Sequence, residues 1–122
     1  MAAKPKREKI SAVDTAWLRM DRPQNLMMIC GVLLFRRRLS LSRLRQVIAG
    51  RFLVFKRFKQ RAVEAPGMAF WETDTHFDIR RHVVHAALPG RAGRKELQEF
   101  VSGLATTPLD PAHPMWQFHL VD

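Results

Sequence analysis

The sequence is poor in three features that would each define a class of protein: cysteines, long apolar runs and acidic residues. Its single cysteine, Cys30, excludes an internal disulfide and favours a reducing compartment. The longest apolar run, residues 26–35, has about half the length that crosses a bilayer, so no integral membrane segment is expected. Asp14 and Arg19 interrupt the region after the basic N-terminus, which therefore does not resemble a secretory signal peptide. We expect a cytoplasmic protein.

The shortage of acidic residues leaves a strongly basic chain. Against 21 Lys and Arg there are 11 Asp and Glu, giving a formal charge of +10 over 122 residues. Such a charge attracts phosphates, whether on nucleic acid, on anionic lipid or on a nucleotide-bearing cofactor. The arginines at 36–38 and the run "KRFKQR" at 56–61 combine basic and aromatic residues, as nucleic-acid surfaces do.

The basic runs nevertheless have a simpler interpretation. Phe52, Phe55 and Phe58 recur every three residues, which is typical of one buried face with solvated basic residues outside it. No helix-turn-helix, zinc-finger or RNA-binding signature accompanies the charge. We therefore expect no nucleic-acid partner, while attraction to anionic lipid or to a phosphate of a cofactor stays open.

The composition, 47% hydrophobic and 26% charged, is that of a globular domain without repeats. Residues 1–9 are expected to be a basic flexible arm. Ser11 is placed to cap a helix with an apolar stripe that includes Val13 and Trp17, and this helix should end before Pro23. The apolar run at 26–35 predicts a buried strand, in which Cys30 is a small core residue.

The rest of the chain alternates between helical and extended patterns. Helices are predicted at 41–50, behind the cap Ser40, and at 94–105. Strands are predicted up to Val63 and at 68–72, joined by a turn at 65–67. Residues 77–88 and the final stretch from 115 are predicted to be extended, with Trp116 on the core face. Strands mixed with helices predict a two-layer α/β sandwich.

Four histidines are candidates for chemistry. His82 and His85 have metal-like spacing, but on a strand they would project to opposite faces, so no metal site is expected. His113 lies in a proline-rich loop and His119 between apolar neighbours. Either could act as a general base near neutral pH, but the sequence identifies no orienting partner or oxyanion donor for them. We interpret both as structural.

Five blocks of the sequence, in this order, resemble the beginning of the bacterial wax ester synthase/diacylglycerol acyltransferase family. They begin with "ISAVDTAWLRMDRPQNLMMICGVLLF" and end with "PLDPAHPMWQFHLVD". Matching positions in the first block are Ser11, Asp14, Arg22, Pro23, Asn25 and Gly31. Matching positions in the last are Pro108, Leu109, Asp110, Pro114 and Trp116. Met115 stands where the family usually has leucine and His113 where it usually has arginine.

The resemblance implies both a fold and a reaction. Residues 10–122 would be a partial two-layer α/β sandwich, the N-terminal part of a fold like that of chloramphenicol acetyltransferase and other CoA-dependent acyltransferases. That fold has two α/β sandwich domains and a central tunnel. Members transfer an acyl group from acyl-CoA, as co-substrate, to diacylglycerol or a long-chain alcohol, with no further cofactor. Pro114 and Trp116 would then flank the tunnel or support its wall. Peripheral association with anionic membrane or lipid droplets is also implied.

The family's catalytic signature, His-His-x-x-x-Asp-Gly, follows shortly after the strand that begins at the Pro-x-Trp motif. No His-His pair and no Asp-Gly occurs in these 122 residues. We therefore expect the chain to be an N-terminal portion that ends before the catalytic motif and is inactive alone. The alternative is a basic module that binds lipid or CoA phosphates and acts with a separate catalytic half, the missing C-terminal part.

Overall fold

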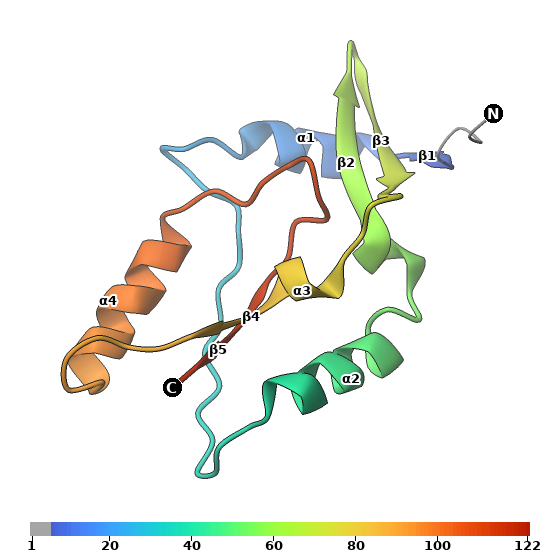
Figure 1. The fold of residues 1–122 in the computed structure, drawn as a ribbon. Coiled ribbons are helices and arrows are strands. Elements are labelled where there is room, and N and C mark those ends of the chain that lie inside the picture. Colours follow the sequence, from blue (N-terminus) through green and yellow to red (C-terminus); the bar gives the residue numbers. More distant parts are fainter. Residues whose placement is uncertain (1–5) are drawn as a thin grey trace.

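The computed structural model describes residues 6–122, which form two small sheets with helices around them (Figure 1). The mixed α/β class predicted from the sequence is confirmed. In chain order the elements are β1 (Arg7–Lys9), α1 (Ala12–Met20), α2 (Leu41–Arg51), the 3-10 helix η1 (Lys56–Lys59), β2 (Gln60–Ala65), β3 (Met68–Thr73), α3 (Ile79–His82), β4 (Val83–Ala86), α4 (Arg94–Ala105) and β5 (Phe118–Val121).

The first sheet is antiparallel, in the order β1-β3-β2. Its hairpin turns at Pro66 and Gly67, where Gly67 has a φ of 74°, a conformation that glycine adopts without steric cost. The predicted turn and the two strands around it are therefore confirmed. The prediction of a flexible arm is wrong for Arg7–Lys9, because these residues pair with β3 as strand β1. Residues 1–5 of that arm lie outside the described residues.

A buried carboxylate ties this sheet together. Glu72 on β3 is 4% exposed and accepts hydrogen bonds from Arg7 Nε at 2.6 Å and Arg61 Nη2 at 2.7 Å. The strand register places both arginines opposite Glu72, one on each neighbouring strand. The hydrogen bonds from Arg61 and Arg7 hold the pKa of Glu72 below its ordinary value.

The second sheet joins β4 and β5 in parallel, with Val83 opposite Phe118. Helix α2 lies against β4, and Arg45 donates from Nε and Nη2 to the Val83 carbonyl at 3.1 and 2.9 Å. Val83 itself is 0% exposed and belongs to the core. Arg45 therefore connects α2 to the second sheet.

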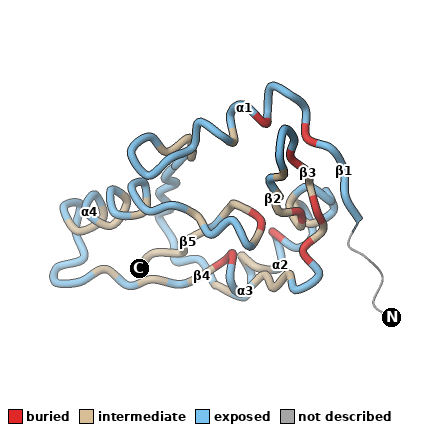
Figure 2. The backbone as a smooth tube through the Cα atoms, turned by 90° about the horizontal axis from the view of Figure 1, so that it is seen from above, coloured by how far each residue is buried: buried red, intermediate tan, exposed pale blue. Residues whose placement is uncertain are grey.

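The three predicted helices are confirmed. In α1 the Ser11 hydroxyl accepts from the Asp14 N–H at 3.2 Å, and in α2 the Ser40 hydroxyl accepts from the Arg43 N–H at 3.3 Å. The apolar stripe of α1 does not enter the core, however, since Trp17 is 52% exposed. Figure 2 shows buried residues around β3 and the start of β4 and none on α4.

The prediction of a buried strand at residues 26–35 is wrong. This stretch, the 26–35 segment, is an irregular chain in the connection between α1 and α2 (Figure 1). Ile29 is 96% exposed and Leu33 80%, and Cys30 is exposed rather than a core residue. No strand among residues 6–122 lies in register with it, so a β-ladder cannot form.

The extended structure predicted for 77–88 is only partly found. Ile79–His82 makes one helical turn, α3, because the Asp78 carboxylate accepts from the Arg80 N–H at 3.0 Å and caps it. Only Val83–Ala86 is a strand. Across residues 6–122, none of the helices has the length and apolar character required of a membrane span.

Candidate functional site

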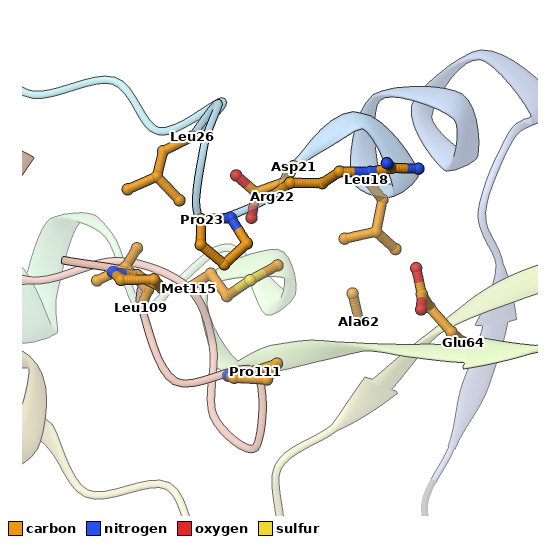
Figure 3. Close-up of a pocket in the computed structure, with 11 residues that line it drawn as sticks. Leu18, Asp21, Arg22, Pro23, Leu26, Ala62, Glu64, Leu109, Pro111 and Met115 are labelled. Atoms are coloured by element: carbon orange, nitrogen blue, oxygen red, sulfur yellow. The ribbon is translucent and has the colours of Figure 1, made fainter. Parts of the chain in front are cut away.

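An open hollow of about 370 Å³ lies where α1 ends, between the Arg22-Pro23 turn, strand β2 and the loop before β5 (Figure 3). Its apolar lining is Leu18, Pro23, Leu26, Ala62, Pro108, Leu109, Pro111 and Met115. Three charged residues, Asp21, Arg22 and Glu64, complete the wall. Two motif blocks that are about 85 residues apart in the sequence thus face one another across a single cavity.

The turn on one side of the hollow is fixed by local hydrogen bonds. The Asn25 N–H donates to the Arg22 carbonyl at 2.8 Å, and the Met27 N–H donates to the Asp21 carboxylate at 2.8 Å. Pro23 has a fixed φ and favours this tight geometry. The arrangement holds Pro23 and Leu26 in the wall across from Leu109 and Met115 (Figure 3).

The loop on the other side, residues 108–116, is the closing loop. It is shaped by Asp110, whose carboxylate accepts from the Ala112 N–H at 2.9 Å. Pro114, one of the two predicted tunnel-flanking residues, is buried and lies in the wall of a smaller hollow of about 40 Å³ behind the loop. Trp116, the other, borders that same small hollow. Neither residue lines the larger cavity.

Trp116 occupies the centre of an aromatic cluster. Its indole Nε1 donates to the Phe58 carbonyl at 2.8 Å, and its ring stacks on the His82 ring at 4.5 Å between centroids. Phe58 and Phe118 contact it edge-on at 6.1 and 5.9 Å. These contacts make Trp116 a link between η1, which leads directly into β2, and β5 of the second sheet.

His82, which the sequence placed on a strand, instead ends α3 and is buried in this cluster at 3% exposure. Its Nδ1 lies 2.8 Å from the Trp116 carbonyl, so Nδ1 carries the proton and donates. Its Nε2 is buried and has no hydrogen-bond partner within residues 6–122. His85 turns away and binds the Asp122 carboxylate at 2.6 Å. The two side chains therefore have different partners, and His82 ends α3 rather than lying on one strand with His85.

His113, interpreted from the sequence as structural, is held by two charged side chains. Its Nδ1 lies 3.2 Å from the buried Asp74 carboxylate, and its Nε2 lies 2.9 Å from Arg81 Nη1. Because an arginine can only donate, Nε2 must accept and Nδ1 must donate to Asp74. The ring is therefore neutral and its lone pair is occupied, which removes His113 as a general base in this arrangement.

The carboxylate of Asp74 receives opposing influences. Burial raises its pKa, whereas the His76 N–H and the His113 ring lower it, and the lowering prevails. His113 stands where the resembling family usually has arginine, so a titratable partner occupies the place of a permanent cation. The sequence did not predict this pair, because Asp74 lies 39 residues from His113. The only indication was a histidine at a position where the resembling family usually has arginine.

His119 also lacks the setting of a catalytic base. Its Nε2 lies 3.3 Å from Gln117 Oε1, and its ring meets Phe100 edge-on. Burial lowers the pKa of His119, which keeps the ring neutral near pH 7. No carboxylate of residues 6–122 orients it, and in that part of the chain no group of three metal-ligating side chains converges. The site offers an apolar cavity rather than a reactive centre.

Comparison with known proteins points to one family. The model of the wax ester synthase/diacylglycerol acyltransferase catalytic domain matches residues 10–122. A protein of Mycobacterium tuberculosis strain H37Rv, named as a candidate diacylglycerol O-acyltransferase, is 38% identical over 68 residues, which are 56% of this chain and 14% of that protein. A second, similarly named protein of the same strain is 30% identical over 90 residues, 71% of this chain and 19% of its own length.

A solved structure is similar as well. The wax ester synthase/diacylglycerol acyltransferase from Marinobacter aquaeolei VT8 superimposes with a TM-score of 0.53 and 31% identity. The match covers 66% of this chain and 20% of that one. The chain thus spans a fifth or less of the length of each of these relatives.

Proposed function

Because this chain belongs to the wax ester synthase/diacylglycerol acyltransferase family, we propose that residues 10–122 form the N-terminal part of an O-acyltransferase domain. The proposed reaction moves a fatty acyl group from acyl-CoA to a diacylglycerol or a long-chain alcohol. The observation that carries this proposal is the family match, which extends through both motif blocks at the hollow.

The hollow supports a role in holding the acyl chain. Leucine, methionine and proline side chains supply most of its wall, and these surfaces suit a hydrocarbon chain whose removal from water is favourable. Arg22 lies at the wall, where its guanidinium can donate hydrogen bonds to the carbonyl oxygen of a thioester or to a phosphate oxygen. In this proposal Pro114 and Trp116 act as supports, since they fix the closing loop that presents Leu109 and Met115.

The acyl-binding role can be tested by equilibrium dialysis with radiolabelled palmitoyl-CoA. Substituting Leu109→Asp places a charge in the hollow and should weaken binding by about tenfold, the equivalent of losing roughly two buried methylene groups. Leu39→Asp is the matched control, because Leu39 is 38% exposed and not part of the wall. Equal affinities for the two variants would contradict the assignment of the hollow.

The chemical step needs a base that these residues do not supply. Alcoholysis of a thioester requires a general base at the attacking hydroxyl, and the family's His-His-x-x-x-Asp-Gly does not occur in this sequence. We therefore expect the 122-residue chain alone to give no turnover with labelled palmitoyl-CoA and diolein or hexadecanol. Product above the buffer blank would overturn this expectation.

A second candidate function follows from the surface charge. The arginines at 36–38 are all exposed on a chain of net charge +10, as expected of a peripheral module that binds anionic lipid or CoA phosphates. Sedimentation with phosphatidylglycerol vesicles should then decrease strongly between low and high salt. Sedimentation that does not change with salt would argue against this function.

A further inference from the structure

The stretch that leads into α2 presents a serine directly after a run of arginines (Figure 1). Its sequence, "RRRLS", covers residues 36–40, and every one of these residues is exposed. No acidic side chain of residues 6–122 forms an ion pair with an arginine of this run. No hydrogen bond joins a backbone group of residues 36–39 to the rest of the described chain. An accessible, unpaired basic peptide therefore ends at the Ser40 hydroxyl.

The Ser40 hydroxyl is held by local contacts. It accepts a hydrogen bond from the Arg43 N–H at 3.3 Å and lies 3.0 Å from the Ser42 hydroxyl. The backbone of Ser40 is extended, with a φ of −84° and a ψ of 132°, and α2 begins after it at Leu41. Because helix ends fray readily, turning this hydroxyl outward costs one cap bond and breaks no hydrogen bond to another element.

We propose that Ser40 is a phosphorylation site for a serine/threonine protein kinase with an acidic substrate groove. Such a groove binds arginines two and three residues before the acceptor, here Arg38 and Arg37, through carboxylates. In the reaction, the Ser40 Oγ forms a bond to the γ-phosphorus of Mg²⁺-bound ATP, while the bond from that phosphorus to the β–γ bridging oxygen breaks. The hydroxyl proton passes to the catalytic aspartate of the kinase, and ADP leaves.

Two other serines show that neither exposure nor a position at a helix end is enough for such a site. Ser42 is also exposed, but no arginine stands two or three residues before it. Ser11 caps α1 as Ser40 caps α2, but the residue three positions before it is Glu8, and Arg7–Lys9 is paired with β3. A kinase groove needs both the arginines and an unpaired chain, and Ser40 has both.

The phosphate changes the charge of this surface. A phosphoserine carries about −1.5 to −2 charges at pH 7, which offset most of the charge of two of the three arginines beside it. No acidic residue lies in the first turn of α2, where phosphate oxygens can accept from backbone N–H groups. Phosphorylation therefore weakens the attraction of the arginines at 36–38 for anionic phosphates. This effect rests on the proposed peripheral function, whereas the modification itself does not.

The site is tested by incubating the 122-residue chain with the catalytic subunit of cAMP-dependent protein kinase and labelled ATP, and mapping the phosphate by mass spectrometry. Phosphate should appear on Ser40; Ser40→Ala should remove it, and Ser42→Ala should label at the wild-type rate. Arg37→Gln combined with Arg38→Gln should slow labelling by about a hundredfold, since two charge-assisted contacts are lost. Arg43→Gln, on the other side of the serine, is the matched control. Phosphate on a different serine would overturn the proposal.

A peptide of residues 34–44 provides the fully accessible reference. The folded chain should label within about tenfold of the peptide rate, because the acceptor ends an exposed and unpaired stretch. Slower labelling of the chain, or none, would mean that the fold conceals Ser40 and would refute the site.

The charge effect is measured by sedimentation with phosphatidylglycerol vesicles at low salt, before and after phosphorylation. The phosphorylated chain should bind about tenfold more weakly, because the positive charge near the lipid surface is reduced. Ser40→Ala, taken through the same incubation, is the control and should sediment like the unmodified chain. Equal sedimentation of the two forms would contradict the charge effect. An unmodified chain that does not sediment would refute the peripheral function, whereas the phosphate map decides the Ser40 site separately.

Discussion

The 26–35 segment is much richer in apolar residues than the first sheet, yet only the sheet forms strands. In the sheet, β3 has a neighbour on each side, and its central carboxylate, Glu72, is paired to an arginine from both. The segment has no neighbour in register among the described residues, and Ile29 is almost wholly exposed. An apolar composition is therefore not enough to form a strand. β3 pairs with β2, which is close to it in the sequence, and with β1, which is far from it, whereas the segment pairs with no strand among the described residues.

The largest effect is expected at Trp116, which joins η1, the short helix directly before β2, to β5. Trp116→Ala removes the ring from Phe58 and His82 and should lower the free energy of unfolding by about 3 kcal/mol. Trp116→Phe is the matched control, because it keeps a ring and loses chiefly the hydrogen bond to the Phe58 carbonyl, at about 1 kcal/mol. Urea unfolding followed by circular dichroism measures both. Equal losses for the two variants would show that the hydrogen bond, and not the packing of the ring, accounts for the contribution of Trp116 to stability.

The next effect tests the closed sheet. Glu72→Gln removes the buried charge that binds Arg7 and Arg61, and should cost about 2 kcal/mol at pH 7. Glu64→Gln on β2 is the control, since Glu64 is exposed. Because the pKa of Glu72 is lowered in the fold, its contribution is full above the ordinary value of 4.5 and is lost as pH falls through the folded pKa.

The gap between wild type and Glu72→Gln should therefore shrink when unfolding is measured at pH 3 rather than pH 7. A gap that is constant with pH would mean that the carboxylate acts by shape and not by charge. The first sheet would then differ from the 26–35 segment only in the pairing of its strands.

A smaller effect is expected where the closing loop meets the first sheet. His113→Ala takes a hydrogen bond from the buried Asp74 and should cost about 1 kcal/mol at pH 7. His76→Ala is a close control, because His76 is exposed and its backbone N–H still donates to Asp74. Nitrogen NMR should place the proton of His113 on Nδ1. A proton on Nε2 would contradict the Asp74–His113–Arg81 arrangement.

The elements that the sequence predicted well are those with local signals. The caps at Ser11 and Ser40 and the turn at Gly67 each satisfy backbone groups within a few residues, so their patterns carry the answer. The hollow was not predictable, because its two walls come from motif blocks at opposite ends of the sequence. Pro114 and Trp116 were identified as supports or tunnel neighbours, but only three-dimensional contacts show that they lie behind the wall.

The failures have one physical cause. Cys30 was predicted to be buried because its neighbours are apolar, and the 26–35 segment to be a strand for the same reason. Burial, however, belongs to a pair of surfaces, and a sequence pattern describes one of them. Two further features lack a partner among residues 6–122. His82 Nε2 has no hydrogen-bond partner, and β4 and β5 pair with each other but with no third strand.

The smallest effect is expected at Ile29 and gives the sharpest comparison. Ile29→Ser removes a large apolar side chain that is 96% exposed, so it should change the stability of the 122-residue chain by less than about 0.5 kcal/mol. Val83→Ala, at a side chain of 0% exposure, should cost about 2 kcal/mol although it removes fewer atoms. Thermal unfolding of both variants measures the difference. If Ile29→Ser were as costly as Val83→Ala, the segment would already be packed in this chain, and the contrast between a closed sheet and an unpaired strand would be lost.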